Sequence, residues 1–81
     1  MRHTFSNLKR VIIYNRYVGN SKEVVFCYCV AYFSVGGVQD RVTYSCFYQL
    51  PKSVLRFIRE FDFYVIPEGN YEVEVYERTV A

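Results

Sequence analysis

Residues 23–48, EVVFCYCVAYFSVGGVQDRVTYSCFY, decide the fold of this chain because they contain two strands and the turn between them. Residues Glu23–Ser34 are apolar at odd and even positions alike, which is typical of a central strand with both faces covered. Residues Gly36–Gly37 then fit a two-residue turn that requires positive φ. The stretch therefore predicts an antiparallel hairpin whose second strand is Val38–Tyr48.

A tight turn also predicts which residues of the hairpin lie opposite each other, from Val35 with Val38 to Cys27 with Cys46. One face then carries Val25, Cys27, Cys29, Ala31, Phe33 and Val35 with Val38, Asp40, Val42, Tyr44, Cys46 and Tyr48. This face is mostly apolar, so we expect a helix to cover it. The other face carries Phe26, Tyr28, Val30, Tyr32 and Ser34 with Gln39, Arg41, Thr43, Ser45 and Phe47. It mixes aromatic and polar groups, so we expect it to meet solvent or a partner.

Two further strands are expected outside the hairpin. Val11–Tyr17 is β-branched and aromatic, which predicts a first strand. Tyr71–Glu77 alternates cleanly after the strong turn formers of Pro67–Asn70, which predicts a final strand. Residues 62–66 are too short to classify and leave a further short strand open. In the final strand, the inward residues are expected to be Tyr71, Val73 and Val75, and the outward ones Glu72, Glu74 and Tyr76.

A helix is expected between the hairpin and the final strand. Pro51 suits a first helical turn, where its missing N–H would have no partner anyway. One apolar face with helical spacing follows, made of Val54, Phe57, Ile58 and Phe61. The chain is thus predicted to be one α+β domain, residues 1–81, with the order β-β-β-α-β and one helix packed on one face of an antiparallel sheet.

Charge is unevenly distributed although the net charge is only +2. Residues 1–59 hold nine Lys or Arg against two acids, and residues 60–81 hold six acids against Arg78. The two halves are expected either to neutralise each other when the final strand docks or to mark a charged partner. The sequence contains no run of about 18 uncharged apolar residues, so no membrane span is expected. Three cysteines, an odd number, suit reduced thiols, so a cytoplasmic protein is expected.

The sequence favours a protein that is not an enzyme. His3 is the single histidine and lies at the N-terminus, where we expect it to be mobile and unable to act as a well-held base. Gly36–Gly37 precedes a strand rather than a helix, which argues against a phosphate loop. No cofactor or metal is expected, because Cys27, Cys29 and Cys46 lack the usual ligand spacing and fit small apolar packing better.

Binding is the class of function that remains, and a protein partner is the first hypothesis. Tyr and Arg are enriched at interface hot spots, and the chain contains nine Tyr. The candidate contact residues are Lys52, Arg56 and Arg59 on the helix, Tyr28, Tyr32 and Arg41 on the sheet, and Glu72 and Glu74 on the final strand. The alternative is a single-stranded nucleic-acid-binding domain that uses the aromatic and basic sheet face.

A small, Tyr-rich α+β chain with opposed charge patches and no catalytic set resembles the phage-encoded inhibitors of host defence, including anti-CRISPR proteins. The resemblance covers size and composition and rests on no motif. It implies a non-catalytic inhibitor that blocks a host protein or nucleoprotein complex in the host cytoplasm. Either a monomer or a homodimer formed through an exposed strand edge is compatible with the sequence.

Overall fold

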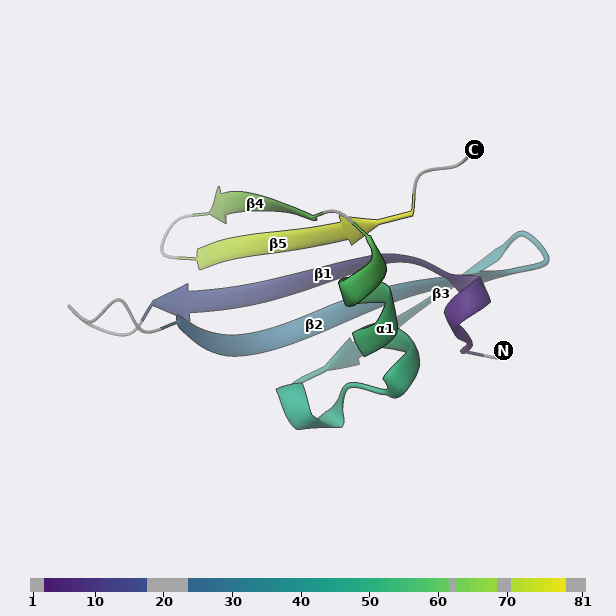
Figure 1. Cartoon of the computed structure of the whole chain (residues 1–81), viewed down its shortest axis with the longest axis horizontal. Coiled ribbons are helices and arrows are strands. Elements are labelled where there is room, and N and C mark those ends of the chain that lie inside the picture. Colours follow the sequence, from purple (N-terminus) through teal and green to yellow (C-terminus); the bar gives the residue numbers. More distant parts are fainter. Residues whose placement is uncertain (1–2, 18–23, 62, 69–70, 79–81) are drawn as a thin grey trace.

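The computed structural model describes residues 3–17, 24–61, 63–68 and 71–78. Its elements are the 3-10 turn η1 (Phe5–Asn7), β1 (Leu8–Tyr17), β2 (Val24–Val35), β3 (Val38–Tyr44), the 3-10 turn η2 (Phe47–Gln49), α1 (Lys52–Glu60), β4 (Phe63–Glu68) and β5 (Tyr71–Glu77). The strands form one antiparallel sheet in the order β3-β2-β1-β5-β4, and α1 lies across one of its faces (Figure 1). The α+β class is confirmed, and the short strand left open before the last turn is present as β4.

The hairpin of β2 and β3 forms as the two glycines predict. Gly36 and Gly37 have φ values of +57° and +82°, and Val35 lies opposite Val38. The second strand ends at Tyr44, however, because the chain then turns into η2. The predicted strand as far as Tyr48, with Cys46 opposite Cys27, is therefore wrong at its end.

A bulge in β2 changes which side chains face the helix. Tyr28 lies opposite Tyr14 and Phe26 lies opposite Asn15, so Cys27 is an extra residue in the pairing with β1. An extra residue exchanges the two faces of the strand beyond it, since side chains alternate. Phe26 accordingly packs against the core under α1 rather than on the opposite face, which corrects its predicted position.

The main core lies between α1 and the sheet. Val54 and Phe57 are fully buried, while Ile58 and Phe61 are partly buried, so the predicted apolar face of the helix is confirmed. The sheet side of this core comprises Leu8, Val11, Ile13, Cys29, Ala31, Phe33 and Tyr76. In the described ranges no helix is long and apolar enough to cross a membrane.

A second, smaller core lies on the other face of the sheet. Ile12, Val73 and Val75 are buried there, with Tyr14 and Tyr32 packed against them. Their position follows from the pairing of β1 with β5, which sets Ile12 opposite Val75. The acidic final strand thus pairs with a basic first strand. This is one of the two arrangements expected from the uneven distribution of charge.

His3 is held on the hairpin rather than mobile, which corrects the expectation for this residue. Its ring stacks on Phe33 with centroids 4.5 Å apart, and its Nε2 is paired with the carboxylate of Asp40. The hydrogen bond with His3 is the main cause that lowers the pKa of Asp40, with burial opposing it. The contact joins the start of the chain to β3.

We expect acid to loosen this contact. Because the pKa of Asp40 is lower in the folded chain, its stabilising contribution is present above the ordinary aspartate pKa of about 3.9 and is lost as the pH falls through the folded value. Carboxyl carbon shifts measured by NMR during a pH titration give that pKa. His3→Ala should return it toward 3.9, and an unchanged Asp40 pKa in this variant would contradict the assigned contact.

Candidate functional site

The face of the sheet opposite α1 gathers aromatic and basic side chains from three strands. We call it the tyrosine face and define it by Arg10, Tyr14, Tyr28, Tyr32 and Arg41. The α-helix of the described ranges lies on the other side of the sheet (Figure 1). Tyr28, Tyr32 and Arg41 were predicted to share this face, and the strand pairing confirms that they do.

One row of the tyrosine face places a ring between two cations. Tyr32 on β2 lies opposite Arg41 on β3 and opposite Arg10 on β1. The Arg10 guanidinium carbon lies 5.8 Å from the centroid of the Tyr32 ring, within the range of a cation–π contact. Arg10 and Arg41 are both exposed, and Arg10 also lies opposite Glu77 on β5.

A second row contains two stacked tyrosines. The rings of Tyr14 and Tyr28 lie 4.3 Å apart at an interplanar angle of 17°, and the two residues are directly opposed on β1 and β2. Tyr28 is 38% exposed, and Tyr14 is half-buried. Because one side of each ring is covered by the other ring, each ring has at most one open face.

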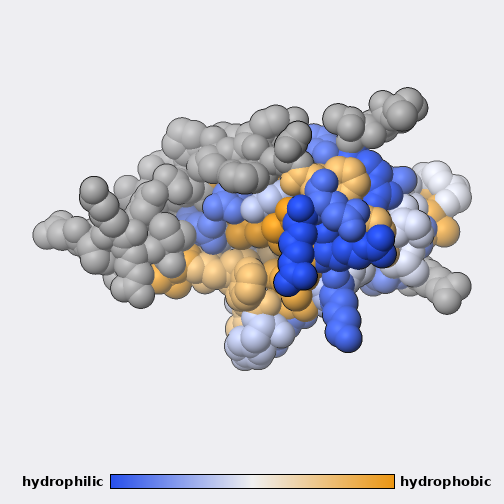
Figure 2. All heavy atoms as spheres, in the orientation of Figure 1, coloured by the Kyte–Doolittle hydropathy of each residue, from blue (hydrophilic) through white to orange (hydrophobic). Residues whose placement is uncertain are grey.

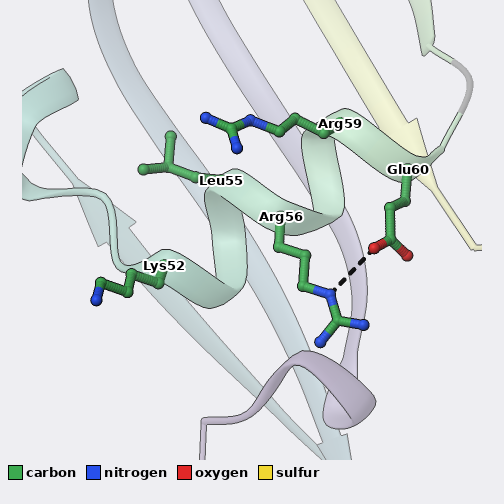
Figure 3. Close-up of a pocket in the computed structure, with 5 residues that line it drawn as sticks. All are labelled: Lys52, Leu55, Arg56, Arg59 and Glu60. Atoms are coloured by element: carbon green, nitrogen blue, oxygen red, sulfur yellow. Dashed lines mark hydrogen bonds and ion pairs between the residues drawn. The ribbon is translucent and has the colours of Figure 1, made fainter.

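The basic residues of α1 border one open hollow of about 500 Å³ on the helix surface, together with Leu55 and Glu60 (Figure 3). Arg56 is already engaged within the chain, since its Nε donates to Glu60 Oε1 at 3.0 Å and its guanidinium lies 4.0 Å from the Phe5 ring centroid. All three predicted basic residues are nevertheless exposed and lie around the same hollow, although Arg56 makes these contacts within the chain.

The acidic strand β5 is also arranged differently from the prediction. Glu74 and Tyr76 were expected to point outward, but they lie on the helix side of the sheet, where Tyr76 is buried. The reason is that Val73 and Val75 fill the smaller core, so the alternate residues of β5 must turn toward α1. The side chain of Glu72 lies outside the described residues.

Three polar side chains on this side form a connected cluster. Tyr76 donates its hydroxyl to Glu74 Oε2 at 2.9 Å, and Asn15 Nδ2 donates to Glu74 Oε1 at 3.4 Å. Asn15 is only 8% exposed. Burial is the main cause that raises the pKa of Tyr76, and the nearby Glu74 carboxylate raises it further. Tyr76 therefore remains a neutral hydrogen-bond donor at ordinary pH.

This cluster lies in a hollow of about 530 Å³ between the sheet, α1 and η2. Apolar atoms are exposed beside α1 and are bordered by its hydrophilic side chains (Figure 2). The lining residues are Ile13, Asn15, Phe26, Phe47, Leu55, Ile58, Arg59, Glu74 and Tyr76. Asn15 was not identified from the sequence, and Phe47 was predicted on the opposite face, because both positions depend on how η2 and the bulged β2 meet the helix.

The cysteines are free thiols with different surroundings. Cys29 is buried in the main core, and burial raises its pKa to about 12. Cys27 and Cys46 are half-buried. In the part of the chain that the structure describes, no three His, Cys, Asp or Glu side chains are grouped as metal ligands would be.

Comparisons with protein-family models, curated proteins and solved structures find no match to this chain. A function must therefore be argued from its own residues. Two of these, Arg10 and Tyr14, complete the tyrosine face and were not predicted. The alternation of β1 places both on one side of the strand, but Arg10 lies outside the predicted strand Val11–Tyr17, and which strand borders β1 could not be read from the sequence.

Proposed function

We propose that this chain is a non-catalytic protein-binding module whose contact surface is the tyrosine face. The observation that supports it is the row in which Tyr32 lies between Arg10 and Arg41, beside the stacked pair of Tyr14 and Tyr28. Tyr and Arg supply much of the binding energy at protein interfaces. Here they stand on a rigid sheet above a small apolar core, so little side-chain freedom is lost on binding.

The stacked pair favours a protein over a nucleic acid as the partner. Bases that stack on a sheet need ring faces that are open. Tyr14 and Tyr28 cover one face of each other, and Arg10 lies over the ring of Tyr32. Ring edges, phenolic groups and guanidinium groups around an apolar centre instead match the composition of protein interfaces.

An inhibitor is the form of binding module that we propose. The chain resembles small phage-encoded inhibitors of host defence in size and composition, and such a protein acts by occupying a surface rather than by chemistry. The partner we propose is a larger host protein or nucleoprotein complex in the host cytoplasm. Its contact area is expected to be acidic at the positions that meet Arg10 and Arg41.

Truncation of Tyr32 should remove most of this binding. We expect Tyr32→Ala to weaken partner affinity by about 30-fold or more, because a central aromatic anchor and the ordering of two arginines are lost together. The measurement is quantitative capture by immobilised chain from lysate of the host cells, with captured proteins identified by mass spectrometry. Tyr48→Ala is the matched control, since Tyr48 is 84% exposed on η2 and lies away from the tyrosine face.

The proposal requires a stoichiometric partner that the unaltered chain and Tyr48→Ala both retain. A partner retained equally by Tyr32→Ala and by Arg41→Glu would show that another surface makes the contact. Recovery of no stoichiometric protein would remove the protein-binding function itself.

Single-stranded nucleic acid is the second candidate, and the three arginines Arg10, Arg16 and Arg41 support it. All three are exposed, and the strand pairing places them on the tyrosine face or at its border. Fluorescence anisotropy with an oligonucleotide of about 15 nucleotides tests it. Affinity should fall steeply as salt is raised, and Arg41→Gln should lower the salt dependence. No shift at low ionic strength would remove this candidate.

A further inference from the structure

We propose that the hollow beneath α1 is a binding site for an arginine side chain of a peptide or protein. It lies on the opposite side of the sheet from the tyrosine face, so it is a second site and does not depend on the proposed function. Its floor is the cluster of Asn15, Glu74 and Tyr76, and its walls are largely apolar.

The floor of the hollow accepts hydrogen bonds and carries a negative charge. Glu74 is held by two neutral donors, Tyr76 and Asn15, one on each carboxylate oxygen. Each carboxylate oxygen has further lone-pair capacity, and the Asn15 carbonyl oxygen is an acceptor as well. No cation among the described residues is within ion-pair distance of Glu74. A half-buried carboxylate of this kind is best compensated by a cation that only donates.

The walls fit the rest of an arginine side chain. Phe26 and Phe47 meet edge to face, with ring centroids 5.5 Å apart and planes at 82°. Phe47 is 53% exposed, so one of its ring faces can receive a flat guanidinium or its methylene stem. The volume of about 530 Å³ exceeds that of a single side chain and leaves space for the flanking peptide.

Arginine fits better than lysine or an anion. A guanidinium presents five donors in a planar fork, which suits several acceptors on one floor beside aromatic walls, whereas an ammonium is a compact and strongly hydrated charge. Arg59, on α1 at the edge of the hollow, is the one cation among the described residues that line it. Arg59 would repel an arginine ligand slightly and would attract an anionic ligand. Removing its charge should therefore strengthen the binding of arginine and weaken the binding of an anion.

The test is an NMR titration of the full chain with N-acetyl-arginine methylamide, compared with the citrulline analogue, which has the same shape without the charge. We expect amide shifts confined to the lining residues and millimolar binding that is at least about 10-fold weaker for citrulline. Equal binding of the two probes, or no shifts at tens of millimolar arginine probe, would overturn the proposal.

Three variants locate the binding on the hollow. Glu74→Gln should weaken arginine binding by about 10-fold or more, and Phe47→Ala, at a ring that is 53% exposed, should weaken it about 3- to 10-fold. Arg59→Gln should strengthen it about 2-fold by removing a like charge. Glu77→Gln, the same change of charge at an exposed position of β5 on the other side of the sheet, is the control and should change nothing.

Each variant has an outcome that contradicts the proposal. Unchanged binding in both Glu74→Gln and Phe47→Ala would place the arginine elsewhere. Weaker binding in Arg59→Gln would contradict the proposal, because removing a like charge cannot weaken the binding of a cationic probe, and the arginine assignment would be wrong. Partner capture by the tyrosine face is measured separately, so either site can fail without the other.

Discussion

Phe57→Ala is expected to lower the free energy of unfolding by about 3 to 5 kcal/mol, the usual cost of removing a buried aromatic ring. Phe57 is fully buried at the centre of the main core. Its ring lies 4.7 Å from that of Phe61 and 6.3 Å from that of Phe5. These neighbours belong to different elements and cannot all collapse into the space left, so a cavity remains.

Such a loss is a large part of the total stability. A chain of 81 residues is expected to have a free energy of unfolding of about 4 to 12 kcal/mol. Urea denaturation followed by circular dichroism should therefore show Phe57→Ala to be marginal or unfolded. Tyr48→Ala, which also removes a ring but from an exposed position, should stay within about 0.5 kcal/mol of the unaltered chain. A Phe57→Ala variant with near-normal stability would contradict the described core.

Arg78→Ala is expected to cost about 2 to 4 kcal/mol, although Arg78 follows the last strand. Its Nη1 and Nη2 donate to the carbonyl oxygens of Ser6 and Phe5, both at 3.1 Å. Its guanidinium carbon also lies 4.9 to 5.4 Å from the ring centroids of Phe5, Phe57 and Phe61. The side chain thus joins the end of β5 to η1 and to the helix.

Two comparison variants make this expectation specific. Arg78→Lys keeps the charge but not the planar fork, so it should recover less than half of the loss. Arg16→Ala removes an exposed arginine of β1 and should change stability by less than about 0.5 kcal/mol. Equal, small losses in Arg78→Ala and Arg16→Ala, measured by the same urea denaturation, would show that the contacts of Arg78 contribute little.

The elements that could be predicted are those whose signals are local. The Gly36–Gly37 turn requires a backbone that glycine adopts freely, and both residues have it. The spacing of Val54 and Phe57 requires only that one side of a helix meets a core. The register of a tight hairpin follows from its turn, which is also a local signal. Tyr28, Tyr32 and Arg41 were therefore correctly predicted to share one face of the sheet.

The site residues that could not be predicted depend on contacts between distant parts of the chain. The bulge at Cys27 arises where β2 pairs with β1. The sequence of the β2–β3 hairpin therefore does not indicate that Phe26 changes face. Arg56 is exposed, as its helical position predicts, but its contact with Phe5 could not be predicted because Phe5 lies at the other end of the chain. Arg10 and Tyr14 joined the tyrosine face because β1 became a central strand.

Glu74 shows most clearly where local pattern stops and packing decides. Alternation in Tyr71–Glu77 determined that Glu74 lies on the other side of the strand from Val73 and Val75, and the structure agrees. Alternation says nothing about which side α1 covers. Because β5 has a small apolar core on one side and the helix on the other, the acidic side of the strand turned inward. Glu74, which was expected to face solvent, therefore lies at the floor of a hollow.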